Sequence, residues 1–403
     1  MIILFVSDVS ISKVIGGAER VLYEQSTRLA RKGHSVHILT RRLPEHDSDH
    51  ELIQKVAEWR YCVDLRNPLA FLRSTQQNSR ELFEKLQQEH PFDRINFHQP
   101  FSALGVIQSP KGRSINKIYT CHSLSSEEYI SRNPKPQTLL ERMQYHLNVQ
   151  GRRLIEKKVL DRANMIITLS AFTIEKLRRA YGLEPDNMVV IPGGVDLERF
   201  TPAVDRLQIR RRLNIPTDKF ILFSVRNLVS RMGLDRLIRA FKAVVLKIPN
   251  VYLVLGGTGP LKESLVELSR EMGLEHHIHF TGFISEEALP DYYRSADVFI
   301  LPTLELEGFG LVTLEALACG TPVLGTPVGG TQEILSRFDG RFLFQDTSPD
   351  AISQLIIDTC RKYRNQPDQW HLDSRRCRSF AEQYYSWDMN VDATEHLFSR
   401  NIR

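Results

Sequence analysis

The feature that most constrains the fold is a repeated alternation of short apolar segments with longer amphipathic ones. The short segments have the length of buried strands, and helical patterns such as 18–31 and 137–163 lie between them. Strand–helix–strand repetition predicts parallel sheets covered by helices on both faces. The first set of expected strands is 2–6, 36–39, 95–97, 117–120, 165–169 and 188–191. The second set is 220–225, 252–255, 277–281, 298–301 and 322–325. Two successive sets predict two doubly wound α/β domains.

The segment 191–202, IPGGVDLERFTP, separates the two sets of strands. It contains two prolines and two glycines and has no clear hydrophobic period, which is typical of a hinge between domains. A chain of 403 residues is long enough for two domains of ordinary size, each with its own core.

The amino-acid composition indicates the broad class of protein to which the chain belongs. Hydrophobic residues make up 42% and charged residues 25% of the chain, as in soluble globular proteins, and no apolar run approaches the eighteen or so residues of a membrane span. The N-terminal segment MIILFVSDVS lacks a basic region and a cleavage site, so we expect a buried first strand there and not a signal peptide. The five cysteines are scattered without a CxxC pair, which predicts a reduced, cytoplasmic chain without structural metal.

Positive charge is concentrated in the first half of the chain. Residues 1–195 contain 28 Lys and Arg against 21 Asp and Glu, a net charge of +7, whereas the remainder has a net charge of −2. One interpretation is a basic surface that faces an anionic partner, such as the inner face of a membrane. The other is a mild excess spread over solvent-exposed helices. For the basic helix within 137–163, we expect core packing of its apolar face in preference to membrane insertion.

The richest motif is the segment 304–330, LELEGFGLVTLEALACGTPVLGTPVGG, where Glu307 and Glu315 stand eight positions apart. Between them lie the turn Gly308-Phe309-Gly310 and an apolar run that predicts a helix. Backbone N–H groups at the start of such a helix form an anion site suited to a diphosphate. Glu315, on the same helix, can accept hydrogen bonds from a sugar or ribose hydroxyl.

This segment resembles the donor site of the family 4 retaining glycosyltransferases, whose signature is Glu-x7-Glu within EGFGL…EA-A-G-PV. The resemblance runs from residue 1 to about residue 340 and implies the GT-B fold, in which two Rossmann-like domains face each other across a cleft. It implies an acceptor domain over 1–195, a nucleotide-sugar donor domain over 196–380, and a C-terminal helix over 381–403 that crosses back to the first domain. In this family, the first glutamate holds sugar hydroxyls and the second holds the ribose.

Other positions match the family's donor-binding motifs. The resemblance places the donor at Gly16, Gly17, Glu19, Gly257, Gly282, Phe283, Ile284, Gly308, Phe309, Gly310, Leu311, Val312 and Glu315. His122 follows the expected strand 117–120 at its carboxyl end, where open α/β sheets bind ligands. The resemblance implies that this histidine contacts the donor sugar.

One position departs from the family pattern. Arg226 ends the strand 220–225, and the family places a lysine six residues later, where this chain has Met232. The arginine and the lysine hold the diphosphate leaving group in the family. Since methionine carries no charge, we expect the neighbouring Arg231 to supply the second cation.

The resemblance implies a retaining, metal-independent hexosyltransferase of glycan biosynthesis. Its donor would be a nucleotide-diphosphate sugar, a UDP-sugar ahead of a GDP-sugar, and its acceptor a glycan, lipid-linked or small-molecule hydroxyl. The expected catalytic residues are His122, Arg226, Arg231 and Glu307, with no metal, no cofactor besides the donor substrate and no nucleic acid. Asp47 and Asp49 form a D-x-D pair in a polar loop, which we do not expect to bind metal. Two alternatives are a sugar-nucleotide epimerase on the same scaffold and a sugar-nucleotide-binding protein without turnover.

Overall fold

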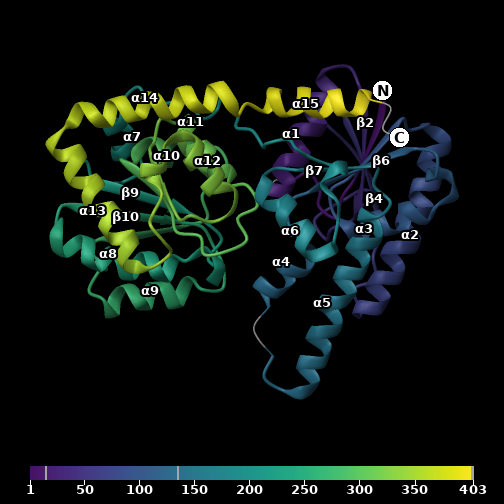
Figure 1. Cartoon of the computed structure of the whole chain (residues 1–403), viewed down its shortest axis with the longest axis horizontal. Coiled ribbons are helices and arrows are strands. Elements are labelled where there is room, and N and C mark those ends of the chain that lie inside the picture. Colours follow the sequence, from purple (N-terminus) through teal and green to yellow (C-terminus); the bar gives the residue numbers. More distant parts are fainter. Residues whose placement is uncertain (14–15, 134–135, 401–403) are drawn as a thin grey trace. The chain divides into compact units, whose positions relative to one another are not determined.

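The computed structural model describes residues 1–13, 16–133 and 136–400 and contains two compact units (Figure 1). Unit 1 is Met1–Gly193 together with the segment from Trp387 onward, and unit 2 is Gly194–Ser386. Each is an α/β unit built on its own sheet, which confirms the fold class predicted from the alternation of strands and helices.

Unit 1 contains an eight-stranded sheet in the order β3-β4-β2-β1-β5-β6-β7-β8. All neighbouring strands are parallel except β3 and β4, which form an antiparallel pair at one edge. The strands are β1 (Ile2–Val6), β2 (Ser35–Arg41), β3 (His50–Ile53), β4 (Val56–Tyr61), β5 (Arg94–Phe97), β6 (Asn116–Cys121), β7 (Met165–Thr168) and β8 (Met188–Val190). Because β1, β5 and β6 are parallel neighbours, their carboxyl ends meet at one edge of the sheet.

Two hydrophobic cores lie on the two faces of this sheet. Alternate side chains of β1 point to opposite faces: Leu4 and Val6 pack in one core, and Ile3 and Phe5 in the other. The helices of unit 1 are α1 (Gly17–Arg31), α2 (Pro68–Glu89), α3 (Pro100–Gln108), α4 (Ser125–Arg132), α5 (Leu139–Leu160), α6 (Ala171–Tyr181) and α15 (Trp387–Ser399). The second core holds α1 and α15, and the first holds α2, α3 and part of α5.

Unit 2 contains a five-stranded, wholly parallel sheet in the order β11-β10-β9-β12-β13. Its strands are β9 (Phe220–Val225), β10 (Val251–Gly256), β11 (Ile278–Gly282), β12 (Val298–Leu301) and β13 (Val323–Gly325). Its helices are α7 (Arg206–Arg212), α8 (Leu234–Lys247), α9 (Lys262–Glu271), α10 (Leu289–Ser295), α11 (Leu311–Ala318), α12 (Gly329–Asp339), α13 (Pro349–Asn365) and α14 (Pro367–Tyr384). Helices α8, α9 and α13 cover one face, and α10 and α11 the other (Figure 1).

The structure differs from the sequence prediction at the C-terminus. The single helix expected over 381–403 is interrupted, because α14 ends at Tyr384 and α15 begins at Trp387. Between them, the Tyr385 carbonyl accepts a hydrogen bond from the Val195 amide (2.8 Å), and Ser386 forms a β-bridge with Val195. Pairing with this distant segment interrupts a pattern that is helical on both sides.

The structure corrects a second expectation, which concerns the packing of the long basic helix α5. Its buried side chains are confined to Val149, Glu156, Val159 and Leu160, so the expected core packing of its apolar face holds only for its C-terminal half. No helix among the described residues is both long enough and apolar enough to cross a bilayer.

Candidate functional site

The carboxyl edge of the unit 2 sheet gathers most of the predicted donor-site residues. Arg226 follows β9 directly, and the loop that carries Glu307 follows β12. Because β9 and β12 are paired parallel strands, two side chains 81 positions apart in the sequence meet at one edge of the sheet. This edge is where ligands bind in open α/β sheets.

Arg226 and Glu307 form a nearly buried ion pair. Arg226 Nη2 donates to Glu307 Oε2 (2.5 Å), and Thr303 Oγ1 donates to the same oxygen (3.1 Å). Both of these hydrogen bonds fall on Glu307 Oε2. The buried Met232, at the position of the family's lysine, contacts the Arg226 guanidinium through its sulfur, 3.1 Å from Nε and 2.9 Å from Nη2. Arg226 is therefore held from two sides before any ligand arrives.

The loop before α11 is held in an unusual backbone conformation. Leu306 has a φ of 58°, which a side-chain-bearing residue rarely adopts. Arg231 Nη1 donates to the Leu306 carbonyl (3.1 Å), and the Leu304 amide donates to the Arg231 carbonyl (2.8 Å). Arg231 therefore contacts the loop backbone that positions Glu307.

Helix α11 begins behind this loop. Gly310 is its N-cap, with a φ of 93° that favours glycine. The first amides of the helix, those of Leu311 and Val312, have no helix carbonyl within reach. They are the amides for which the sequence predicts an anion site, with the positive end of the helix dipole behind them. Gly308 precedes them, and Phe309 is buried, so Phe309 can contribute to the site through its backbone.

Glu315 lies one turn further along α11. Its carboxylate accepts a hydrogen bond from the Tyr293 hydroxyl (2.8 Å). Burial and then the charge of Glu315 raise the pKa of Tyr293 well above its usual range, so the phenol remains a donor and orients the carboxylate. Tyr293 lies on α10, 22 positions earlier, and the sequence pattern alone does not indicate this pairing.

The predicted glycines Gly257 and Gly282 lie at the carboxyl ends of β10 and β11. Gly257 has a φ of 118°, and a Cβ there would lie 1.8 Å from the Arg226 carbonyl oxygen, so only glycine allows this approach. Its amide donates to the Gly282 carbonyl (2.7 Å), which joins the ends of β10 and β11. Phe283 follows with an exposed ring, and Ile284 packs over Gly256.

The remaining predicted residues lie in unit 1. Gly16 is the N-cap of α1, Gly17 begins the helix and Glu19 stands in its first turn. The preceding residues 14 and 15 lie outside the described part of the chain. His122 follows β6 at the carboxyl edge of the unit 1 sheet. The structure therefore brings the Arg226–Glu307–Glu315 set together in unit 2 and places His122, Gly16, Gly17 and Glu19 in unit 1.

A hydrogen-bond chain that the sequence analysis does not identify fixes the proton position on His122. Thr120 Oγ1 donates to Asn96 Oδ1 (3.0 Å), so the Asn96 Nδ2 group faces His98 Nε2 (3.3 Å) and donates to it. His98 then carries its proton on Nδ1 and donates it to His122 Nε2 (3.0 Å). His122 is left with a protonated Nδ1, a buried donor with no hydrogen-bond partner among the described residues. The sequence signal that could have identified His98 is its position, because it is a polar residue directly after the predicted strand 95–97.

Both imidazoles are neutral in this arrangement. Burial lowers the pKa of His122 to about 4, and burial followed by the proximity of His122 lowers the pKa of His98 well below its usual value. A neutral pair is what the chain of donors and acceptors requires, because a second proton on either ring would remove an acceptor.

The side chains that could bind metal do not cluster in the described part of the chain. No group of three or more His, Cys, Asp or Glu side chains in the described ranges could hold an ion. Asp49 forms an ion pair with Arg42 (2.9 Å) in the loop before β3.

Two protein-family models match this chain. The model described as Glycosyltransferase Family 4 matches residues 15–199, and the one described as Glycosyl transferases group 1 matches residues 205–372. Among solved structures, sucrose-phosphate synthase from Thermosynechococcus elongatus superposes with a TM-score of 0.81 at 23% identity, covering 99% of this chain and 98% of that one. WaaG, a glycosyltransferase involved in lipopolysaccharide biosynthesis, superposes with a TM-score of 0.74 at 18% identity, covering 99% of this chain and 100% of that one.

Curated relatives are similar in sequence. A GDP-mannose-dependent alpha-(1-6)-phosphatidylinositol monomannoside mannosyltransferase of Mycobacterium tuberculosis is 30% identical over 222 residues, 52% of this chain and 57% of that enzyme. The chain thus spans little more than half the length of this relative. A D-inositol 3-phosphate glycosyltransferase of Kineococcus radiotolerans is 28% identical over 414 residues, 96% of this chain and 91% of that enzyme.

The two parallel α/β units and their structural neighbours define a protein of the GT-B fold class. The chain belongs to glycosyltransferase family 4, a family of retaining enzymes.

Proposed function

We propose that this protein is a retaining glycosyltransferase that moves a hexosyl group from a nucleotide-diphosphate sugar to an acceptor hydroxyl. The observation that carries the proposal is the buried Arg226–Glu307 pair beside the start of α11. The Arg226 cation and the first amides of α11 lie at one sheet edge, which supports binding of a diphosphate there.

The chemistry follows from this arrangement. The bond between the sugar C1 and the diphosphate oxygen breaks while the acceptor oxygen bonds to C1 on the same face. The departing diphosphate takes the acceptor's proton, so no side chain need act as a covalent nucleophile. Arg226 and the α11 amides stabilise the negative charge that develops on the leaving group, a contribution that is largest when the donors are preorganised.

Each carboxylate has a distinct role in the proposal. Glu307 uses Oε2 to fix Arg226 and Oε1 to accept a sugar hydroxyl. Glu315, oriented by Tyr293, accepts from the ribose. His122 donates its Nδ1 proton to the donor sugar, and Gly16, Gly17 and Glu19 contribute from the start of α1.

For the donor, UDP-sugars and GDP-sugars both suit a site defined by the diphosphate. The name of the mycobacterial relative supports GDP-mannose as the first donor to be tried. For the acceptor, the relatives' names favour inositol-containing or lipid-linked alcohols over other glycans or small molecules.

The test is incubation of the full chain with GDP-mannose, UDP-glucose and UDP-N-acetylglucosamine, with and without phosphatidylinositol and inositol phosphate, followed by NMR of the products. We expect an acceptor-dependent product that keeps the donor's anomeric configuration, formed equally in EDTA. Isomerised donor without transfer would identify an epimerase, and binding without either product would identify a binding protein. Activity lost in EDTA and restored by magnesium or manganese would contradict metal independence.

His98 is expected to act as a positioning residue for His122. In His98→Ala, His122 loses the donor that holds its proton on Nδ1. Turnover should then fall about tenfold, which is less than the roughly 100- to 10,000-fold that a fully positioned group contributes, because His122 itself is retained. Nitrogen-15 NMR should show the Nδ1–H tautomer of His122 in the wild type and a mixture in the variant. Because burial lowers the His122 pKa to about 4, its signals should titrate only as the pH falls toward that value.

The matched control is His276→Ala, since His276 is exposed in unit 2 and should leave both the tautomer and the turnover unchanged. A wild-type His122 protonated on Nε2, or a His98→Ala variant with unchanged tautomer and turnover, would remove His98 from this role.

A further inference from the structure

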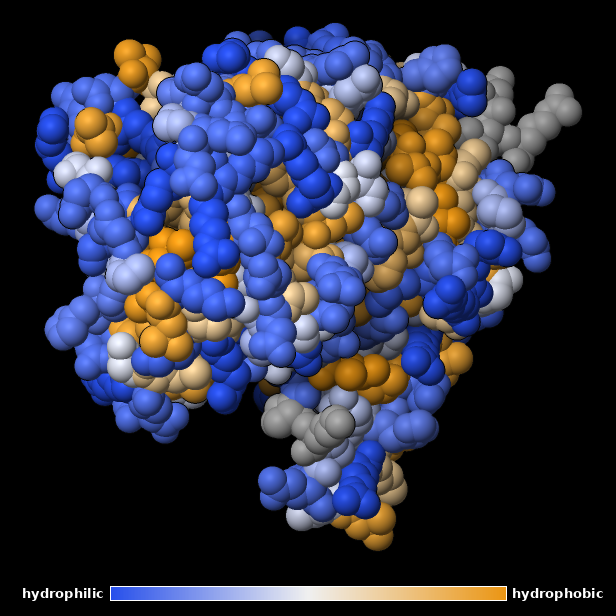
Figure 2. All heavy atoms as spheres, turned by 60° about the vertical axis from the view of Figure 1, so that its left-hand side comes forward, coloured by the Kyte–Doolittle hydropathy of each residue, from blue (hydrophilic) through white to orange (hydrophobic). Residues whose placement is uncertain are grey.

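A buried carboxylate lies in the second half of helix α5. Glu156 is one of the four buried side chains of this helix, and it is 0% exposed. The start of α5 extends away from the unit 1 sheet in Figure 1, and Figure 2 shows it as a projection at the bottom of the view. Glu156 therefore stands in the part of α5 that packs against the sheet, where an ionised side chain is costly unless it is well bonded.

Three donors converge on the Glu156 carboxylate. The Tyr181 hydroxyl donates to Oε2 (2.5 Å), and the Tyr119 hydroxyl donates to Oε1 (3.1 Å). The Ser125 amide lies within hydrogen-bond distance of both oxygens, at 3.1 and 3.3 Å. Tyr119 lies on β6, Tyr181 ends α6 and Ser125 begins α4. One carboxylate of α5 is thus bonded to three neighbouring elements of unit 1.

The bond from Ser125 supplies an N-terminal cap that α4 otherwise lacks. Leu124 is the N-cap residue of this helix, and its apolar side chain accepts no hydrogen bond. The first amides of a helix have no carbonyl partner within the helix, and the helix dipole favours a carboxylate beside them. Glu156 therefore caps α4 from a position 31 residues further along the chain.

The start of α4 also determines where His122 stands. The loop 122–124 joins the end of β6 to the start of α4, and three residues are too few to absorb a movement of either end. His98 holds the His122 ring at the strand end (3.0 Å). Glu156 holds the backbone at the helix end through the Ser125 amide. The two contacts together fix the loop from both sides.

The protonation of Glu156 is balanced between burial and hydrogen bonding. Burial raises the pKa of Glu156 to about 7, although the three hydrogen bonds that the carboxylate accepts lower it. The like charge of Glu128 on α4 adds to the raising effect, and Glu128 itself pairs with Arg132 (3.4 Å). Burial and then the charge of Glu156 raise the pKa values of both tyrosines above their usual range. Both phenols therefore keep the protons that they donate.

The other titratable groups of this cluster do not neutralise Glu156. Burial raises the pKa of the Cys121 thiol on β6 well above its usual value, so the thiol is uncharged. Glu127 of α4 pairs with Lys176 of α6 (2.5 Å). On α5 itself, Arg152 Nη1 donates to the hydroxyl of the first α4 residue (3.4 Å). None of these groups forms a direct ion pair with Glu156 in the part of the chain that the structure describes.

We propose that Glu156 is a positioning residue for His122, and that it fixes the loop 122–124 fully only when it is ionised. The ionised carboxylate accepts all three hydrogen bonds at once. A protonated carboxyl group must place its own proton, so it gives up one of the three donors. The effect on turnover rests on the proposed function, in which His122 contacts the donor sugar, whereas the effect on the loop does not.

The first test is an NMR titration of the full chain without substrate. The signals of the Glu156 carboxyl carbon and the Ser125 amide should titrate together, with a midpoint near the Glu156 pKa of about 7. Tyr181→Phe removes one donor to the ionised form, so both midpoints should rise by about one pH unit. In Glu156→Gln, the Ser125 amide should not titrate in this range.

The second test is the pH dependence of turnover, measured with the donor and acceptor that give product in the assay above. Between about pH 6 and about pH 8, wild-type turnover should rise about tenfold, because the ionised fraction of a group with a pKa of about 7 rises by that factor. Tyr181→Phe should displace the rise upward by about one pH unit. Glu156→Gln should stay at or below the wild-type rate of about pH 6 throughout.

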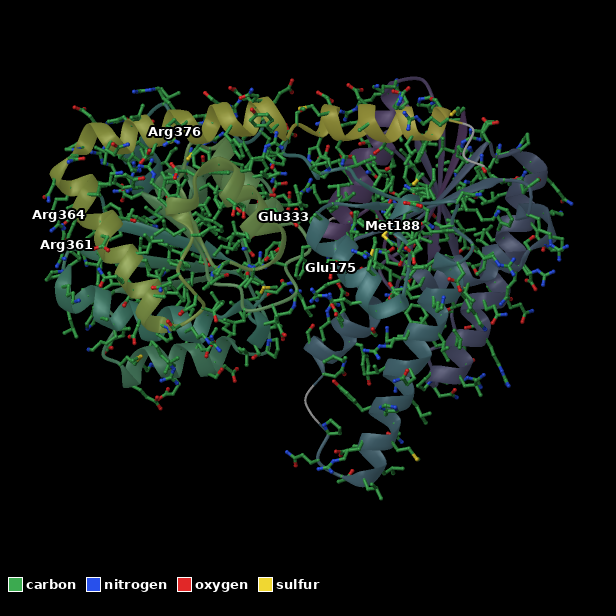
Figure 3. All side chains as sticks on the ribbon, in the orientation of Figure 1. Glu175, Met188, Glu333, Arg361, Arg364 and Arg376 are labelled. Carbon is green, nitrogen blue, oxygen red and sulfur yellow. The ribbon has the colours of Figure 1, made fainter. Side chains whose placement is uncertain are left out.

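The matched control is Glu175→Gln. Glu175 lies on α6 (Figure 3), is half exposed and pairs with Arg179 (2.7 Å). Its replacement changes a glutamate of unit 1 that does not contact the loop 122–124. The pH dependence of turnover and the titration of the Ser125 amide should both match the wild type.

Protein stability provides a third measurement, whose sign is fixed. A glutamate of the unfolded chain has a pKa of about 4.3, so between about pH 4.3 and about pH 7 the folded protein holds a proton that the unfolded chain has released. The stability that this proton contributes is full below about pH 4.3 and is lost as the pH rises to about 7. Across that interval, the urea midpoint of the wild type should fall relative to that of Glu156→Gln.

Two results would overturn the proposal. The first is a Glu156 carboxyl signal that titrates only in the ordinary range of glutamate, or a Ser125 amide that does not follow it. The second is a rise of turnover with pH that Glu156→Gln and Tyr181→Phe both leave unchanged. If no donor supports glycosyl transfer, the proposed enzyme activity fails, and the titration without substrate still decides whether Glu156 holds the loop.

Discussion

Arg226→Ala should lower turnover at least about 100-fold, the range found when one preorganised donor to a developing anion is removed. The same change leaves Glu307 buried without its cation, which should reduce the free energy of unfolding by about 3–5 kcal/mol. The double variant Arg226→Ala/Glu307→Gln should recover much of that stability and none of the activity. Steady-state kinetics and denaturant unfolding of the two variants separate the catalytic contribution from the structural one.

The comparison variants are Arg231→Ala and Arg239→Ala. Arg231 holds the loop of Glu307 through the Leu306 carbonyl, and its loss should lower turnover about tenfold if the residue replaces the family's lysine as the second cation. Arg239 is exposed on α8, so its removal should change nothing. Full activity in Arg226→Ala would exclude Arg226 from the leaving-group site.

Glu315→Gln should weaken binding of the nucleotide sugar by at least about tenfold. An ionised acceptor forms hydrogen bonds worth about 1.5–3 kcal/mol, and the amide replaces one carboxylate oxygen with a donor. Calorimetric titration of the donor measures this loss directly. The matched control is Glu305→Gln, an exposed glutamate on the loop before α11, which should bind the donor as the wild type does. Equal affinities in the two variants would remove Glu315 from the site.

The strands of both sheets could be predicted because buried parallel strands are continuous apolar runs. Residues 2–6, 220–225 and 298–301 are strands with the expected ends. The hairpin of β3 and β4 was missed, because an edge pair with the sequences HELI and VAEWRY has neither an apolar run nor a turn with glycine. The apolar face of α5 was placed in the core because helical periodicity alone does not tell a buried stripe from an exposed one.

The candidate site also has parts that the sequence predicts and parts that it does not. Local sequence contains the two glutamates, the glycine turn and the helix start, which is why the loop and α11 could be predicted together. The contacts Arg226–Glu307, Tyr293–Glu315 and His98–His122 join residues 81, 22 and 24 positions apart. The first and third pairings arise because a sheet brings strand ends together, and the second joins the helices α10 and α11. A single sequence does not encode such pairings in any local pattern.

Calorimetric titration of the full chain with GDP, GMP, UDP and UMP tests the central claim most directly. The claim is that Arg226 and the start of α11 hold a diphosphate. At least one nucleoside diphosphate should then bind about tenfold or more tightly than its monophosphate, because the second phosphate gains charge-assisted hydrogen bonds. Failure of both diphosphates to bind, or equal affinities for diphosphate and monophosphate, would contradict the account.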